Sequence, residues 1–181
     1  NLAEIMKQSF KDANRNVFSE ARNVGSNMGT TLTATLVIGN NVYFANVGDS
    51  MSCLIRDGLM HFQTKPHSYV QSLVDSGNIT VNEARHHPQR NVIHRSIGTN
   101  ENVDIDTYMR ELLPGDLLLI CSDGLTDMLP DEEILNLLID ESNITKASNK
   151  LIKMANEAGG DDNISIVLVR SDSSEKIPNK Y

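Results

Sequence analysis

Three aspartates lie where apolar segments of this chain begin or end, and their chemistry is that of metal ligands. Asp49 and Asp123 follow apolar segments, and Asp162 precedes one. A carboxylate at the end of a buried strand is costly unless its charge is compensated, and three that converge raise one another's pKa unless cations lie among them. Such hard oxygen ligands favour Mg²⁺ or Mn²⁺ over zinc. Each aspartate alone could simply cap a turn, whereas the three together predict a metal site.

The histidines and cysteines do not form a second candidate site. His86 and His87 are adjacent, but no cysteine or histidine partner lies at ligand spacing from them. Cys53 and Cys121 both lie in apolar runs, which is typical of reduced, buried thiols. We therefore expect the two histidines in a surface loop and both thiols in the core.

Hydrophobic patterning predicts the elements that carry these residues. Apolar side chains at helical spacing indicate helices, and β-branched runs bounded by turn residues indicate strands. Helices are expected at residues 1–22, 131–140 and 146–157, with a short helix after Pro66. Strands are expected at residues 30–38, 42–47, 52–56, 59–63, 103–108, 116–121 and 164–169. The pair Asp57-Gly58 is a strong hairpin signal.

Five short motifs, in their order and spacing, resemble those of a known family. They are Met28-Gly29-Thr30-Thr31, Val47-Gly48-Asp49-Ser50, His87-Pro88-Gln89-Arg90-Asn91, Ser122-Asp123-Gly124-Leu125-Thr126-Asp127 and Asp162-Asn163. Together they resemble the metal-dependent protein serine/threonine phosphatases of type 2C, and the similarity is greatest to the bacterial branch. The resemblance extends over residues 1–170.

The resemblance implies an α+β fold, namely a four-layer α-β-β-α sandwich of two mainly antiparallel sheets flanked by helices. One phosphatase domain is expected at residues 1–170, followed by a polar tail at residues 171–181. Residues 64–99 would form a flap beside the active site. The family's N-terminal strands have no match in this chain, so the domain is expected to be incomplete at that end.

The implied activity is metal-dependent hydrolysis of phosphoserine and phosphothreonine in phosphoproteins, without a covalent intermediate. By the resemblance, Asp123 and Asp162 are catalytic and bind two core Mn²⁺ or Mg²⁺ ions. Asp49 would join Asp123 at a third, weaker metal site, with Gly124 beside them. Two such ions lower the pKa of a water between them and neutralise the phosphate oxygens.

Four further residues are expected near the substrate. His67, His87 and Arg90 in the flap would meet the phosphoprotein, although a purely structural role is an equal alternative for them. Asn163, next to Asp162, is the fourth.

A cysteine-based phosphatase is excluded by spacing. That chemistry needs an arginine six positions after the nucleophilic cysteine, where this chain has Asp127 after Cys121 and Leu59 after Cys53.

Departures from the family pattern keep a second function open. The family's N-terminal segment supplies an Asp-Gly pair that bridges the core metals and an arginine that holds the phosphate, and this chain has no match to either. Met51 stands where relatives usually carry an arginine, and Pro66 replaces an aspartate. The alternative is a non-catalytic or catalytically incomplete domain that binds a phosphoprotein or partner, and the isolated chain is expected to be weakly active or inactive. The retained Asp49, Asp123 and Asp162 favour the enzyme, since a binding module has no evident need of mutually repelling carboxylates.

The amino-acid composition limits the classes of partner that this protein is expected to bind. With 16 basic and 24 acidic residues among 181, the net charge is −8, which disfavours nucleic acid or an anionic membrane as a partner. A hydrophobic fraction of 39% suits one globular domain. No apolar run approaches the ~20 residues of a membrane span, and none resembles a signal peptide. We expect a cytoplasmic protein that acts on phosphoproteins and opposes a serine/threonine kinase.

Overall fold

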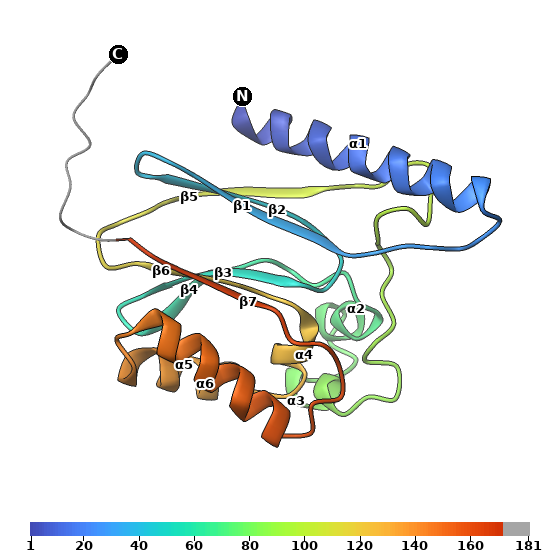
Figure 1. The fold of residues 1–181 in the computed structure, drawn as a ribbon. Helices are drawn as coiled ribbons and strands as arrows, with labels where there is room; N and C mark the ends of the chain where they lie inside the picture. Colours follow the sequence, from blue (N-terminus) through green and yellow to red (C-terminus); the bar gives the residue numbers. More distant parts are fainter. Residues whose placement is uncertain (172–181) are drawn as a thin grey trace, which may run out of the picture.

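The computed structural model describes residues 1–171, which form two antiparallel sheets packed face to face between helices (Figure 1). The first sheet has the order β1-β2-β5 and consists of β1 (Leu32–Ile38), β2 (Asn41–Val47) and β5 (Asp106–Glu111). The second has the order β4-β3-β6-β7 and consists of β3 (Met51–Arg56), β4 (Leu59–Gln63), β6 (Leu117–Cys121) and β7 (Ile166–Arg170). The predicted α+β sandwich of antiparallel sheets is confirmed.

Helices cover the outer face of each sheet (Figure 1). Helix α1 (Leu2–Asn23) lies on the first sheet, while α5 (Asp131–Asp140) and α6 (Ile144–Glu157) lie on the second. Three short helices lie near one end of the sandwich: α2 (Tyr69–Asp75), α3 (Val81–Arg85) and α4 (Asp123–Thr126). None of the helices within residues 1–171 combines the length and apolar composition that a membrane span requires.

Successive side chains of the two central strands, β3 and β6, point to opposite faces of the sheet and so belong to two different layers of the core. On β3 and β6, Cys53 and Leu119 pack with Leu151 of α6, whereas Leu54 and Leu118 pack between the two sheets. Both faces of these strands are covered, which explains why their sequences are almost continuously apolar. The expected burial of the thiols is confirmed, since both Cys53 and Cys121 lie in the core.

The two tight hairpins follow from their turn residues. Asp57 and Gly58 both have positive φ, 51° and 75°, as a two-residue turn between β3 and β4 requires. Gly39, with φ 57°, turns the chain from β1 into β2, where Val37 pairs with Val42.

Several predicted boundaries were wrong. The strand expected at residues 103–108 is β5, three residues later, because pairing with β2 runs from Asp106 opposite Asn46 to Glu111 opposite Asn41. The last strand begins at Ile166 rather than at residue 164, because its pairing with β6 starts with Ile166 opposite Cys121. The helix after Pro66 is confirmed as α2, whereas α3 and α4 were not predicted. Residues 172–181 of the expected tail lie outside the described residues.

Candidate active site

Two of the predicted aspartates meet because β3 and β6 are antiparallel neighbours. Met51 at the start of β3 pairs with Cys121 at the end of β6. Asp49 precedes Met51 by two residues and Asp123 follows Cys121 by two, so both aspartates lie at the same end of these two neighbouring strands. We call this end of the sheet the aspartate edge. Asp123 there begins helix α4, with Gly124 N–H donating to its Oδ1 at 2.9 Å.

Glycines allow the close approaches on which this edge depends. Gly48 has φ 111°, and a Cβ there would lie 2.4 Å from Cγ2 of Thr31. A Cβ on Gly124 would lie 2.4 Å from the carbonyl oxygen of Asn163. Ser122 strengthens this second approach, since its Oγ donates to the Asn163 carbonyl at 3.1 Å. The segment that carries Asp162 is thereby held against α4.

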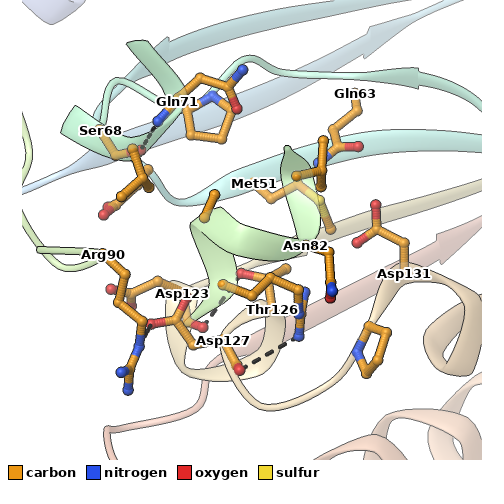
Figure 2. A pocket seen from close by; sticks show the side chains of 17 residues that line it. Met51, Gln63, Ser68, Gln71, Asn82, Arg90, Asp123, Thr126, Asp127 and Asp131 are labelled. Atoms are coloured by element: carbon orange, nitrogen blue, oxygen red, sulfur yellow. Dashed lines mark hydrogen bonds and ion pairs between the residues drawn. The ribbon is translucent and has the colours of Figure 1, made fainter. Parts of the chain in front are cut away.

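A cavity of about 450 Å³ opens beside these aspartates (Figure 2). One side is acidic and consists of Asp49, Asp123 and Asp127. The 64–99 segment supplies a further part of the lining, namely Pro66, Ser68, Val70, Gln71, Val81, Asn82, Ala84, Arg85 and Arg90. The segment predicted to be a flap therefore forms one wall of the cavity.

The carboxylates at this edge repel one another. Burial, followed by repulsion from Asp123, raises the pKa of Asp49 to about 6 from an ordinary value of 3.8. The pKa of Asp127 is also raised, first by burial and then by Asp123, with Asp162 contributing. Arg90 partly offsets this charge, because its Nε lies 3.8 Å from Asp127 and its Nη2 lies 3.4 Å from Asp161. An all-oxygen, mutually repelling donor set fits a hard divalent cation such as Mg²⁺ or Mn²⁺.

The predicted ligand set is only partly assembled. Asp162 does not line the cavity, although its charge acts on Asp127. Within residues 1–171, no three His, Cys, Asp or Glu side chains form a complete metal-binding group. Asp49 and Asp123 are thus brought together with Asp127, while the full set of ligands stays a prediction.

The flap histidines are placed differently from each other. His67 is buried, with its Nδ1 accepting from Gly48 N–H at 3.0 Å and its Nε2 lying 3.1 Å from Asp106 Oδ2. His87 lies 5.9 Å from Tyr69 between ring centroids and does not line the cavity. This placement favours the structural interpretation for His67, whereas Arg90 does line the cavity.

Two acidic residues of the cavity were not among the predicted site residues. Asp127 lies four positions after Asp123, a spacing that puts both on one face of a helical turn, so this signal was present in the sequence. Asp131 at the start of α5 also lines the cavity, and no sequence signal indicated it.

Comparisons with known proteins agree with this architecture. The family model described as protein phosphatase 2C matches residues 1–72. The serine/threonine phosphatase stp of Listeria monocytogenes is 34% identical over 173 residues, which cover 94% of this chain and 69% of that protein. The serine/threonine phosphatase structure of S. agalactiae has a TM-score of 0.87 at 38% identity and covers 95% of this chain and 73% of that one. A structure of the PstP catalytic domain in complex with two manganese ions has a TM-score of 0.83 at 35% identity, and the match covers 93% of this chain and 70% of that one.

The chain belongs to the protein phosphatase 2C family. The expected family, fold and serine/threonine phosphatase function are confirmed, and metal dependence fits the family.

Proposed function

We propose that this protein hydrolyses phosphoserine and phosphothreonine in phosphoproteins with the help of Mn²⁺ or Mg²⁺, using two core ions and a third, weaker one. The observation that carries the proposal is the group of carboxylates at the aspartate edge. Asp49 there has a pKa of about 6, and the pKa of Asp127 is also raised. Carboxylates held together in this way lower their mutual repulsion by binding cations.

Each residue of the edge has a distinct part in this proposal. Asp123 and Asp162 would hold the core ions, and Asp49 would hold the third ion with Asp123. Gly124 has no side chain, which lets the Asp162-Asn163 segment approach α4. When bound, the ions supply the positive charge that activates a water and neutralises phosphate oxygens.

The reaction needs no nucleophile from the protein. Water attacks phosphorus, the bond to the serine or threonine oxygen breaks, and that oxygen takes a proton as inorganic phosphate is released. Burial raises the pKa of the Cys121 thiol to about 12, so this nearby cysteine offers no thiolate. The proposed setting is the cytoplasm, where the protein would oppose a serine/threonine kinase.

The second candidate is a domain of the same fold that binds phosphoproteins without hydrolysing them. One observation favours it, namely that residues 1–171 contain no complete group of three metal-binding side chains. Binding of Mn²⁺ and of a phosphopeptide without release of phosphate would support this candidate.

The test measures Mn²⁺ binding and phosphate release together. Asp123→Asn keeps the side-chain shape but removes a ligand charge, so Mn²⁺ affinity should fall at least tenfold, and release of phosphate from a phosphothreonine peptide by roughly a hundredfold. Asp57→Asn is the matched control, because Asp57 lies in the exposed β3–β4 turn and asparagine tolerates its positive φ. Equal Mn²⁺ affinity in Asp123→Asn and the parent protein, measured by calorimetry, contradicts the proposed site.

A further inference from the structure

One end of the cavity contains a carboxylate without a cationic partner in the described chain. Asp131 begins α5 and lines the cavity together with Met51 and Gln63. In Figure 2 it lies at the right of the view and Arg90 at the left, with Asp123 and Asp127 between them. None of the ion pairs among residues 1–171 involves Asp131.

The charge of Asp131 also acts on the two buried thiols. It is the largest electrostatic contribution, after burial, to the raised pKa of Cys121, and it also raises the pKa of Cys53. Both thiols lie in the sheet formed by β3 and β6. Asp131 is solvent-exposed, and it lines the cavity together with Met51 of β3.

Both arginines that line the cavity are engaged away from Asp131: Arg85 donates to the carbonyl oxygen of Asp127, and Arg90 lies beside Asp127 and Asp161. Met51, only 2% exposed, contributes an uncharged thioether side chain to the lining. Val81 of α3 and Pro130 add further apolar surface. The amide of Gln63 is the polar group that faces the same end.

Apolar surface from Met51, Val81 and Pro130 together with an unpaired carboxylate matches one type of side chain. Lysine and arginine carry an alkyl stem that packs on apolar surface and a charged head that hydrogen-bonds to a carboxylate. A purely aliphatic side chain would desolvate Asp131 without pairing it, and an acidic one would be repelled. A cavity of about 450 Å³ has the size of an ordinary ligand pocket, which exceeds the space that a phosphate needs.

We propose that the Met51–Asp131 end of the cavity is a specificity pocket for a lysine or arginine side chain of the phosphoprotein, close in sequence to the phosphorylated residue. This inference rests on the proposed function and names a class of substrate for the same site. Because no ion pair within residues 1–171 neutralises Asp131, the substrate would supply the cation.

The test compares matched phosphothreonine peptides that carry arginine, norleucine or glutamate at each neighbouring position in turn. Both the binding affinity, by fluorescence anisotropy with Mn²⁺ present, and kcat/KM for phosphate release are measured. At one position at least, the arginine peptide should be favoured over the norleucine peptide by about fivefold, the size of a partly exposed charge pair. Glutamate should be disfavoured at that position.

Variants assign the preference to the pocket. Asp131→Asn should bring the arginine-to-norleucine ratio close to one, and Asp131→Lys should reverse it in favour of glutamate. Glu132→Gln is the matched control, because Glu132 belongs to the same helical turn but does not line the cavity, and the ratio should persist. Met51→Arg should also abolish the preference, with circular dichroism confirming that this buried substitution folds.

The outcomes separate this inference from the proposed function. An arginine preference in binding that depends on Asp131, without phosphate release, supports the pocket and overturns the hydrolase. Phosphate release with a ratio that Asp131→Asn and Asp131→Lys leave unchanged overturns the pocket. Failure of every peptide to bind or react also overturns it.

Discussion

At the scale of single residues, the turn that carries Asp49 is clamped from two sides by His67. The backbone N–H of His67 donates to the Gly48 carbonyl, and the Gly48 N–H donates to Nδ1 of His67, both at 3.0 Å. Because Nδ1 accepts, the neutral ring carries its proton on Nε2, which faces Asp106 at 3.1 Å. Arg95 in turn donates to Asp106 at 2.7 Å. His67, near the start of the flap, therefore positions the predicted metal ligand Asp49 through the backbone of its neighbour Gly48.

Two amide substitutions separate the two hydrogen bonds of this ring. In His67→Asn the side-chain oxygen can take the place of Nδ1 and accept from Gly48, whereas in His67→Gln the longer side chain can reach Asp106 instead. A buried N–H without a partner costs about 1–3 kcal/mol, so His67→Gln should lose that much unfolding free energy and His67→Asn clearly less. Urea unfolding measures the loss, and calorimetry should show weaker Mn²⁺ binding in His67→Gln, with partial rescue in His67→Asn. If the two variants lose equal stability and affinity, the bond to Gly48 has no positioning role.

At the scale of elements, the flap wall is attached mainly through polar contacts. Neither α2 nor α3 contains a buried residue. The capping box of Thr80 and Glu83 stabilises the start of α3 locally, while Arg90 connects the segment to Asp127 and Asp161. Elements with few buried apolar contacts open at low free energy, so this wall should be the most easily opened side of the cavity.

Removal of Arg90 should loosen the flap without unfolding the domain. Arg90→Gln deletes both ion pairs, which are partly exposed and together affect global stability by no more than about 1 kcal/mol. Amide hydrogen exchange should nevertheless become faster in residues 81–92, as mass spectrometry can measure.

The control for this experiment is Lys153→Gln, which deletes an exposed pair with Glu157 on α6 and should leave exchange in the flap unchanged. Unchanged exchange at residues 81–92 in Arg90→Gln would mean that the ion pairs do not hold the flap.

At the scale of the whole molecule, the sheet edge carries repulsion that opposes folding when no metal is bound. The pKa of Asp49 is about 6 in the folded protein and near 3.8 when unfolded, so the folded state binds this proton more tightly. That contribution to stability is complete below pH 4 and is lost as the pH rises through 6. Burial lowers the pKa of His67, which acts in the opposite direction in an overlapping range, and the paired Asp106 and Asp116 act at lower pH.

A comparison with Asp49→Asn isolates this effect, since the other groups titrate in both proteins. In EDTA, the unfolding free energy of the parent protein relative to Asp49→Asn should fall between pH 4 and pH 7. The drop should be on the order of 1–2 kcal/mol, after allowance for the partial exposure of the carboxylate. Saturating Mn²⁺ at pH 7 should instead stabilise the parent protein more than the variant. A difference that does not change with pH would show that Asp49 titrates normally.

Local residue chemistry was sufficient to predict much of this protein. Turn residues such as Asp57-Gly58 adopt their conformations from their own steric freedom, and helical or alternating apolar patterns depend only on the chain's periodicity. For these reasons the hairpins, α1, α5 and α6 were predicted within a few residues. The aspartates at the ends of apolar segments were also visible, because a charge beside a buried strand stands out in any sequence.

The features that could not be predicted from the sequence are those that depend on residues far apart in the chain. The bounds of β5 follow from its register with β2, and Asp49 meets Asp123 only because Met51 pairs with Cys121 across two neighbouring strands. The contact between His67 and Asp106 joins side chains 39 positions apart, and Asp131 reaches the cavity only through the packing of α5. The sequence by itself determined which residues could bind metal or turn the chain, since those properties are local. The tertiary structure decided which of them share one cavity, since strand register and burial arise only when remote segments pack together.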